Sequence, residues 1–433
     1  MSAFESEGSA EVLFGSDGPG EAGRVLCEWF ASCRRELPWR TDPTPYHVWV
    51  SEIMLQQTRV EAVKPYYERF IRELPDIRAL ADCPEDRLHK LWEGLGYYSR
   101  VRNMQRCARV LTEEYGSALP ADYTKLLSLP GIGPYTAGAI ASIAFGIGVP
   151  AVDGNVLRVV ARLRADRRDI RQEAVKRDVF QTLQPLLESG TGEWPEPGRK
   201  DPLPEREQKN ALTERDGVRN PACTDRNYGS ADRREERNVP GTINQALMEI
   251  GALVCVPGGA PHCEKCPLSR WCVSHKNGLT DSIPFRSAPK KRKMEEKTIL
   301  VLLDGTHTLI RRREEKGLLA GMYELPSLSG HRTPEEVLTC LKQEMGLEPV
   351  RIQPLPAAKH VFSHIEWQMT GYRILVTSLG EVNPEAGFLV VRPEETEKQY
   401  PIPAAFRVYA RALSIRLGKA GFAEEESGGK DRD

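Results

Sequence analysis

The stretch from Leu129 to Asn155 constrains the fold of this chain more than any other. It opens with Leu-Pro-Gly-Ile-Gly, a tight turn in which Gly131 and Gly133 can adopt backbone angles that a residue with a Cβ atom resists. A helix rich in small residues follows, and such a turn directs backbone N–H groups at an anion, for example a phosphate. The apolar run then ends at Asp153, so the scaffold holds this carboxylate. Short glycine motifs also recur by chance, and a simple turn between two core helices stays open.

Composition favours two or three domains in a reducing compartment. The chain has 433 residues, and 60 Lys and Arg against 61 Asp and Glu give a formal net charge of −1, so any basic surface must be local. The sequence holds no apolar run long enough to cross a bilayer, and its acidic N-terminus lacks the features of a secretory signal. We therefore expect no membrane partner. Most of the ten cysteines are scattered, which is not typical of a disulfide framework.

Hydrophobic periodicity divides the chain into a mainly helical part and a later mixed part. The pattern over 48–67 predicts a single helix, and few segments before residue 190 alternate like strands. Strand-like alternation begins near residue 298, which indicates an α+β domain. The predicted segments are a disordered tail at 1–22, a helical domain at 23–275, a basic linker at 276–297, an α+β domain at 298–418 and a disordered tail at 419–433.

Residues 193–239 interrupt the helical domain. The segment is charged, rich in Pro and Gly, and nearly free of large aliphatic residues. Such a composition cannot bury enough apolar surface to offset the entropy lost on ordering. We therefore predict a disordered insertion.

Four cysteines stand in the spacing C-x7-C-x2-C-x5-C, at Cys255, Cys263, Cys266 and Cys272. Thiolates at this density bind a soft metal ion or an iron–sulfur cluster. Zinc would be satisfied by four thiolates, but zinc ribbons tend to use two C-x2-C pairs. The spacing alone leaves zinc and a cluster open.

Two carboxylates form a candidate catalytic pair. Glu52 lies among apolar neighbours at helical spacing, and a partly buried carboxyl keeps its proton to higher pH. Taken alone, Glu52 is better explained as a capping or ion-paired residue. Together with Asp153 it supplies what cleavage of a glycosidic bond requires, because one acid protonates the leaving group and one carboxylate faces the oxocarbenium-like carbon.

Several motifs occur in an order that resembles one family. They are Leu37-Pro38-Trp39-Arg40, Thr44-Pro45-Tyr46, Ser51–Thr58, Gly94–Tyr98 and the stretch Leu129–Asn155. The set is similar to the helix-hairpin-helix DNA glycosylases related to endonuclease III, and within them to the adenine DNA glycosylases of the MutY type. The cysteine array resembles the [4Fe–4S] site of these glycosylases, although its first gap holds seven residues where the family has six. The resemblance implies a mainly α glycosylase domain with an iron–sulfur loop.

The second domain carries a further resemblance. Gly317–Pro326 and His360–His364 are similar to the Nudix-like C-terminal domain of MutY proteins, which is α+β. The metal-binding carboxylates of true Nudix hydrolases are missing over Glu335–Gly346, so we expect this domain to bind and not to hydrolyse. The resemblance implies recognition of 8-oxoguanine by Phe362, Ser363 and His364.

The family resemblance also implies an activity. A MutY-type enzyme flips adenine out of a mispair with 8-oxoguanine or guanine and hydrolyses its N-glycosidic bond. In this chain Glu52 matches the acid that protonates adenine, Asp153 the carboxylate that stabilises the sugar cation, and Asn155 a residue supporting it. Tyr135 stands where lyase-type relatives carry a lysine, and a phenol cannot form a Schiff base, which predicts a monofunctional enzyme.

Further residues match binding positions of the family. Gln57 and Tyr97 match side chains wedged into the base stack. The glycines of the hairpin, Gly131 and Gly133, match a phosphate-binding turn. The adenine pocket is matched by Arg35, Leu37, Trp39, Arg40 and Gln245.

The linker contains the basic run Pro289–Lys293, which is typical of a nuclear localisation signal and equally of a solvated linker. We expect a nuclear, and also a mitochondrial, monomer that acts on duplex DNA. By family analogy the linker would dock an AP endonuclease and a sliding clamp. Two alternatives stay open, an endonuclease III-type glycosylase/lyase and a catalytically impaired DNA-binding scaffold.

Overall fold

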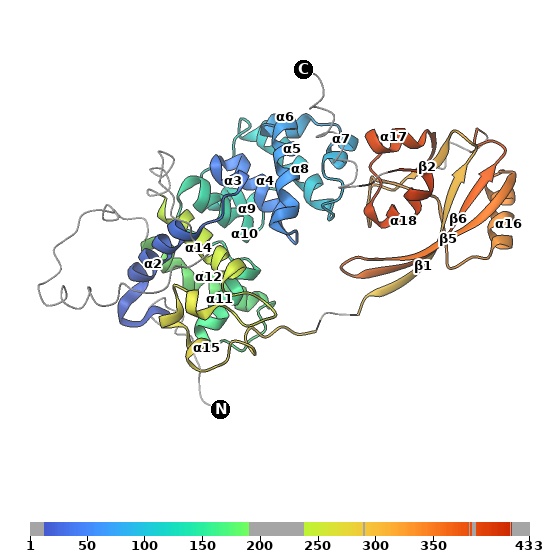
Figure 1. The fold of residues 1–433 in the computed structure, drawn as a ribbon. Helices are drawn as coiled ribbons and strands as arrows, with labels where there is room; N and C mark the ends of the chain where they lie inside the picture. The colour runs from blue at the N-terminus through green and yellow to red at the C-terminus, as the bar shows by residue number, and fades with distance from the viewer. Residues whose placement is uncertain are drawn as a thin grey trace, which may run out of the picture. The chain divides into compact units, whose positions relative to one another are not determined.

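The computed structural model describes residues 13–189, 238–288, 291–380, 382, 387–415 and 417 (Figure 1). These residues form two compact units. One takes residues up to 57 together with 113–287, and the other takes 58–112 together with the residues from 288 onward. In these described ranges no helix is both long and apolar enough to traverse a membrane.

Helices make up the first unit. Their bounds are η1 Gly15–Asp17, α2 Gly18–Cys33, α3 Pro38–Thr41, α4 Pro45–Leu55, α9 Tyr123–Ser128, α10 Pro134–Ala139, η2 Ile140–Ala144, α11 Gly154–Arg164, α12 Glu173–Glu188, α14 Val239–Leu253, η4 Cys263–Lys265, η5 Ser269–Trp271 and α15 Val273–Lys276. Local sequence explains the starts of the helices that carry the site. Thr44 caps α4 by accepting from the His47 N–H at 3.2 Å, and Asn238 caps α14 by accepting from the Gly241 N–H at 2.9 Å.

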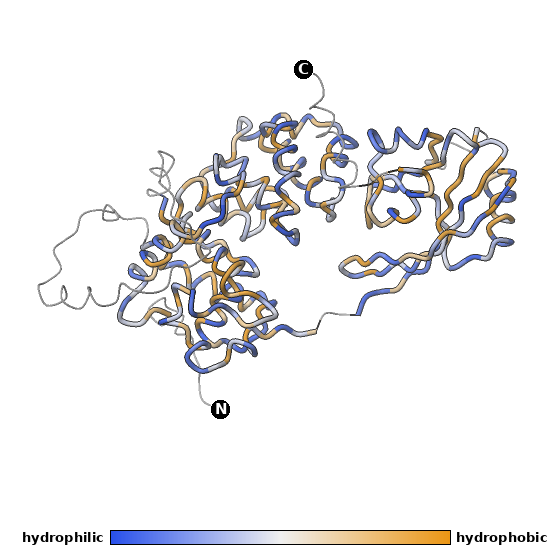
Figure 2. The backbone as a smooth tube through the Cα atoms, in the orientation of Figure 1, coloured by the Kyte–Doolittle hydropathy of each residue, from blue (hydrophilic) through white to orange (hydrophobic). Residues whose placement is uncertain are grey.

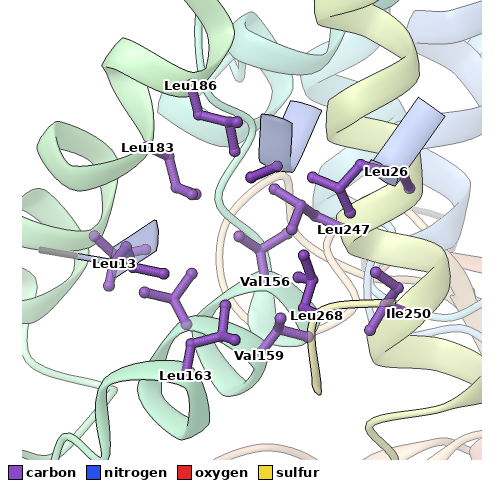
Figure 3. Close-up of a cluster of buried hydrophobic side chains, with 14 of the residues drawn as sticks. Leu13, Leu26, Val156, Val159, Leu163, Leu183, Leu186, Leu247, Ile250 and Leu268 are labelled. Atoms are coloured by element: carbon purple, nitrogen blue, oxygen red, sulfur yellow. The ribbon is translucent and has the colours of Figure 1, made fainter. Parts of the chain in front are cut away.

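The core of this unit joins α2, α11, α12 and α14 (Figure 3). Leucine, isoleucine and valine side chains from these helices meet in one cluster, and each fully buried side chain contributes about 1.5–3 kcal/mol relative to exposure. The core fixes the start of α11 and the face of α14 that bear the functional residues described below.

The N-terminal segment belongs to this core, which corrects the predicted tail at 1–22. Leu13 and Phe14 are buried in the same cluster, and α2 already begins at Gly18. The Phe14 ring packs edge-on against Trp271 at 5.4 Å between ring centroids. Residues 13–22 thus contact the core through Leu13, Phe14 and Ala22, and Asp17 and Glu21 accept hydrogen bonds from Trp271 and Arg270.

The predicted insertion at 193–239 and the predicted tail at 419–433 fall largely or wholly outside the described residues. Only the last two positions of the insertion are described. Asn238 and Val239 form the cap and the first turn of α14, so the helix starts earlier than predicted.

The single helix predicted over 48–67 is wrong. The chain forms α4 and then α5 Val60–Glu73, with a break at Gln57, whose φ is +57°. A left-handed residue cannot continue an α-helix, so apolar periodicity that runs through the break hides it. Three further helices, α6 Ile77–Asp82, α7 Glu85–Leu91 and α8 Ser99–Glu114, complete the helical part of the second unit.

The remainder of the second unit is a mixed sheet with helices on both faces. The described strands are β1 Lys293–Leu303, β2 Thr308–Arg312, β3 Tyr323–Glu324, β4 Ser327–Ser329, β5 Pro349–Val361, β6 Ile365–Val376 and β7 Phe388–Val391. Their order is β3-β2-β1-β6-β5, with β4 paired to β1 and β7 to β2. The pair β1–β6 is parallel, and the other pairs are antiparallel. The helices are α16 Pro334–Glu344, α17 Pro393–Lys398, η7 Ala404–Phe406, α18 Arg407–Ala410 and η8 Arg411–Leu413.

Alternation along β1 builds two apolar clusters. Ile299 and Val301 face the cluster that includes residues of η7 and α18, whereas Leu300 and Leu302 face the cluster under α16. The strand also begins earlier than predicted, because Lys293 is already paired with Ile365 of β6. The predicted linker at 276–297 is therefore too long at its C-terminal end.

Candidate active site

Glu52 and Tyr135 meet at the centre of the first unit. Glu52 lies in the last part of α4 and is 6% exposed, and Tyr135 lies in the first turn of α10. The Tyr135 hydroxyl donates a short hydrogen bond to Glu52 Oε2. Burial and the negative charges of Glu52 and Asp153 raise the pKa of Tyr135 well above its usual value, so the hydroxyl keeps its proton. Tyr135 therefore acts as a donor to the glutamate.

The surroundings of Glu52 favour its protonated form. Burial raises its pKa to about 7, and the negative charge of Asp153 adds to the rise, while the Tyr135 hydrogen bond and the charge of Arg40 oppose it. A carboxyl with a pKa near neutrality can donate a proton under physiological conditions. The structure thus gives Glu52 the proton affinity that a general acid needs.

Asp153 is held at the N-terminus of α11 by several donors. Its Oδ1 accepts from the backbone N–H groups of Asn155 at 2.9 Å and Val156 at 2.7 Å, and its Oδ2 accepts from the Asn155 side-chain amide at 2.7 Å. Burial raises the pKa of Asp153, whereas these hydrogen bonds and the charge of Arg158 favour the carboxylate. Three donors and the positive end of the helix dipole offset much of the cost of burying the negative charge.

Asn155 is itself fixed by neighbouring side chains. Arg158 donates to Asn155 Oδ1 at 2.9 Å and to the carbonyl oxygen of Gly251 at 2.6 Å. A Cβ atom on Gly251 would lie 2.4 Å from the Asn155 Cβ, so only glycine lets α14 approach this closely. Asn155 therefore orients Asp153 through a chain of contacts that includes α14.

A second charged group lies beside this pair. Arg35 donates from Nε and from a terminal nitrogen to the two carboxylate oxygens of Glu249, at 2.8 and 2.9 Å. Arg40 donates to Glu249 Oε2 at 3.1 Å and to Gln245 Oε1 at 3.2 Å. Burial by itself would raise the pKa of Glu249, but the two guanidinium groups lower it to about 2. Glu249 therefore stays ionised and anchors both arginines.

The sequence prediction missed Glu249. It is 1% exposed and lies four residues after Gln245 on α14, so both side chains point to the same side of the helix. That spacing was the available signal. Nothing in the sequence distinguishes this glutamate from an ordinary surface residue until α14 is placed against α2.

Two other predicted pocket residues belong to the same region of the chain. Leu37 caps α3 and Trp39 lies within it, and each is 6% exposed. The Arg40 N–H donates to the Leu37 carbonyl oxygen at 2.9 Å. Leu37 and Arg40 are thus joined by a backbone hydrogen bond, and Trp39, which lies between them in the sequence, is buried.

Comparison with known proteins identifies the family. Residues 50–185 match the HhH-GPD superfamily base excision DNA repair protein, and residues 298–412 match the NUDIX domain. The adenine DNA glycosylase of Mus musculus is 31% identical over 398 residues, which cover 79% of this chain and 68% of the mouse protein. The human adenine DNA glycosylase is 30% identical over 447 residues, which cover 89% of this chain and 73% of that protein. This chain belongs to the adenine DNA glycosylase family.

The relationship extends to bacterial proteins. An adenine DNA glycosylase of Buchnera aphidicola subsp. Baizongia pistaciae is 28% identical over 360 residues, which cover 82% of this chain and 86% of the bacterial protein. The resemblance and the fold class predicted from the sequence are confirmed. As a member of this family, the chain is a base excision repair glycosylase, an enzyme that cleaves N-glycosyl bonds.

The four predicted cysteine ligands of this glycosylase lie near one another. Burial and the neighbouring cysteines raise the pKa of the Cys266 thiol to about 12, and Cys263 and Cys272 shift in the same direction. Such thiols give up their protons to a bound metal centre. Among the described residues, no three His, Cys, Asp or Glu side chains are arranged to hold one metal ion.

The longer first gap of this cysteine array forms an outward loop. Residues 257–260 are exposed, and Gly258 adopts a φ of +68°, which favours glycine. The His262 N–H donates to the Val254 carbonyl oxygen at 2.9 Å and closes the loop at its base. The additional residue is therefore accommodated on the surface.

The cysteine loop also contacts α11. Arg158 Nε donates to the Cys255 carbonyl oxygen at 2.7 Å, and Arg162 donates to the Cys255 sulfur at 3.3 Å. Both arginines lie on α11, whose first residue follows Asp153. The cysteine loop is thus joined to the helix that Asp153 caps.

The predicted hairpin glycines differ from each other. Gly131 has a φ of +76°, as the prediction requires. Gly133 caps α10 with φ −92° and ψ 177°, an extended conformation that any residue adopts, so the predicted need for unusual angles is wrong at this position. A Cβ atom on Gly133 would meet nothing within 4 Å, which leaves the start of α10 open.

The two predicted wedge residues share an unusual backbone. Gln57 and Tyr97 both have positive φ, +57° and +49°, although neither is glycine. Both side chains are exposed, and Tyr97 is 45% exposed. A left-handed conformation in a non-glycine residue costs energy and often marks a functional position.

The predicted recognition residues form the turn between β5 and β6. Ser363 and His364 are exposed, whereas the Phe362 ring is half-buried and packs edge-on against His360 and Trp367, at 4.6 and 4.9 Å between centroids. The Phe362 N–H donates to the Ile365 carbonyl oxygen at 2.8 Å. One aromatic residue thus anchors a turn whose next two side chains face solvent.

Proposed function

We propose that this glycosylase removes adenine mispaired with 8-oxoguanine, or with guanine, from duplex DNA. The observation that carries the proposal is the buried pair of carboxyl groups, in which Glu52 has a raised pKa and Asp153 is surrounded by hydrogen-bond donors. A protonated acid and an ionised carboxylate are the combination that glycosidic cleavage requires.

In the proposed reaction Glu52 protonates adenine and so makes it a better leaving group. Positive charge develops on the sugar as the N-glycosidic bond breaks, and Asp153 stabilises that charge while Asn155 fixes the carboxylate. Tyr135 orients Glu52 through its hydroxyl. Water then adds to C1′ of the sugar and gives a proton back to Glu52. Because a phenol cannot form a Schiff base, the products are free adenine and an intact strand with an abasic site.

We assign base binding to the charged group beside the catalytic pair. A flipped adenine offers ring nitrogens and an exocyclic amine, and Arg40 and Gln245 provide donors and acceptors. Leu37 and Trp39 supply apolar surface, and Glu249 holds Arg35 and Arg40 in position. Gln57 and Tyr97 would fill the space that the flipped base leaves in the stack, because lost stacking must be replaced.

The Phe362–His364 turn is assigned to 8-oxoguanine. Its support is the anchored Phe362 ring and the exposure of Ser363 and His364, whose Oγ and Nδ1 lie 3.2 Å apart in a hydrogen bond. Cys255, Cys263, Cys266 and Cys272 would hold a [4Fe–4S] cluster. A bound cluster would crosslink the loop and fix it against α11.

Single-turnover excision tests the proposal. A duplex with one adenine opposite 8-oxoguanine is mixed with excess enzyme, and strand breaks are counted with and without alkali. Breaks only after alkali support a monofunctional adenine glycosylase. Breaks without alkali favour a glycosylase/lyase, and absence of both from a cluster-loaded protein favours the DNA-binding scaffold.

Variants separate the two assigned functions. Glu52→Gln should abolish excision opposite either base, and full activity would contradict the acid assignment. Ser363→Ala should reduce the preference for 8-oxoguanine over guanine while excision continues. An equal loss on both duplexes would contradict the recognition role.

Nuclear or mitochondrial localisation and docking of an AP endonuclease or sliding clamp at the linker stay predictions. Pro289 and Lys290 of the basic run lie outside the described residues.

A further inference from the structure

The described end of the basic run lies directly beside the proposed recognition turn. The backbone N–H of Lys293 donates to the His364 carbonyl oxygen at 2.9 Å. Arg292 Nε donates to the Phe362 carbonyl oxygen at 3.2 Å. Consecutive residues of the run therefore hold the two carbonyl groups on either side of Ser363.

The charged side chains of the run are exposed to solvent, as are two residues of the turn. Lys291, Arg292 and Lys293 are exposed, as are Ser363 and His364. Figure 1 shows that the β5–β6 hairpin and the beginning of β1 extend together beyond the rest of the sheet, and Figure 2 shows that this beginning of β1 is hydrophilic. The run is thus an edge of the recognition domain and not a detached linker.

Glu295, Glu296 and Glu366 lie near the run on β1 and β6, and Glu295 pairs with Lys293. Lys293 Nζ lies 3.0 Å from Glu295, whose other oxygen accepts from the Trp367 indole N–H at 3.0 Å. An ammonium group carries three donors, so Lys293 retains donors for a further acceptor. Trp367 is also the residue against which Phe362 packs, so the same contacts place the lysine relative to the turn.

We propose that Lys291, Arg292 and Lys293 form a phosphate-binding edge that contacts the DNA backbone next to the base opposite adenine, and that Arg292 also positions the recognition turn. The partner chemistry follows from the charge, since clustered cations beside a base-reading turn match the phosphates that flank a base. The positioning role rests on the proposed function of the turn. The phosphate contact requires only duplex DNA.

The test measures binding of the full chain as a function of salt. The Glu52→Gln background keeps adenine uncleaved, and the probes are duplexes with adenine opposite 8-oxoguanine or opposite guanine. K291Q/K293Q should reduce the magnitude of the slope of log K against log salt by about two, because binding without two phosphate contacts releases fewer counterions. It should weaken binding to both duplexes alike. The matched control is K342Q, which removes an exposed lysine from α16 on the opposite face of the sheet.

Arg292 variants separate charge from positioning. Arg292→Lys keeps the charge but loses the Nε donor, so the salt slope should stay while the preference for 8-oxoguanine falls severalfold. Arg292→Gln should reduce both the magnitude of the salt slope and the preference for 8-oxoguanine. A salt slope in K291Q/K293Q equal to that of K342Q would overturn the phosphate edge, and unchanged discrimination in Arg292→Lys would overturn the positioning role.

Failure of the proposed function has a different signature. If the Ser363→Ala and parent proteins discriminate equally, the turn does not read the opposite base and the Arg292 positioning role fails with it. The salt slopes of K291Q/K293Q and K342Q still decide the phosphate edge, because that comparison needs no preference between bases.

Discussion

The rate of adenine excision should report the proton on Glu52. With a pKa of about 7, the single-turnover rate of the DNA-bound enzyme should change little between pH 5.5 and 6.5 and then bend downward near pH 7. A glutamate at its usual pKa of 4.5 would instead lose roughly tenfold in protonated fraction between pH 5.5 and 6.5. At pH 7.5 the raised pKa keeps roughly a quarter of the enzyme in the protonated form, against roughly one part in a thousand without the rise.

The Tyr135 hydroxyl gives this profile an internal control. Its hydrogen bond stabilises ionised Glu52, so Tyr135→Phe should move the bend upward by about one pH unit, which corresponds to about 1.4 kcal/mol. The assay is quenched-flow excision from pH 5 to pH 9 at saturating DNA, with DNA affinity measured at each pH. A rate that falls tenfold between pH 5.5 and 6.5, or that shows no bend up to pH 9, would refute the acid assignment. A Tyr135→Phe bend at lower pH would refute the account of the hydrogen bond.

Three further results are expected from buried groups. Glu249→Gln should lower the free energy of unfolding by about 3 kcal/mol at pH 7, because its carboxylate is stabilised by ion pairs such as that with Arg35. The difference in the free energy of unfolding between the parent and Glu249→Gln should shrink as the pH falls from 4.5 toward 2, measured by urea titration. A difference that stays constant over this range would contradict the prediction. Gly251→Ala should displace Asn155 and reduce excision while DNA binding persists, so unchanged excision would contradict the close contact. His89 is fully buried with neither ring nitrogen bonded, and burial lowers its pKa to about 4. As the pH falls, His89 is therefore protonated first in the unfolded chain, and the free energy of unfolding should fall by about 3 kcal/mol between pH 6.5 and 4. In His89→Leu this fall should be smaller. An equal pH dependence of the two proteins in urea titrations would contradict the prediction.

The sequence supported the chemistry of the site better than its architecture. Glu52 and Asp153 could be paired because each ends or interrupts an apolar segment, and the structure couples them electrostatically. The spacing of Glu249 from Gln245 was a signal, but the function of Glu249 depends on two arginines that lie more than two hundred residues earlier. Long-range pairs of this kind leave no local pattern.

The boundaries of elements were harder to predict for local reasons. The break at Gln57 depends on a left-handed residue that apolar periodicity does not reveal. The early start of β1 depends on pairing between Lys293 and Ile365, and charged residues at a strand end look like linker. Residues 13–22 make their contacts with residues about 250 positions later in the chain, such as Trp271, and these contacts leave no local pattern.

Asp153 has a structural role as well as a proposed chemical one. It is the cap of α11 and the proposed stabiliser of the sugar cation, so one side chain serves the integrity of the scaffold and the reaction. A lineage that lost the reaction would still have to keep a capping residue here, because replacing such a cap by alanine costs about 1 kcal/mol. Asparagine keeps the cap and removes the charge, so Asp153→Asn is one single substitution by which a relative of this enzyme could become a folded DNA-binding protein without activity.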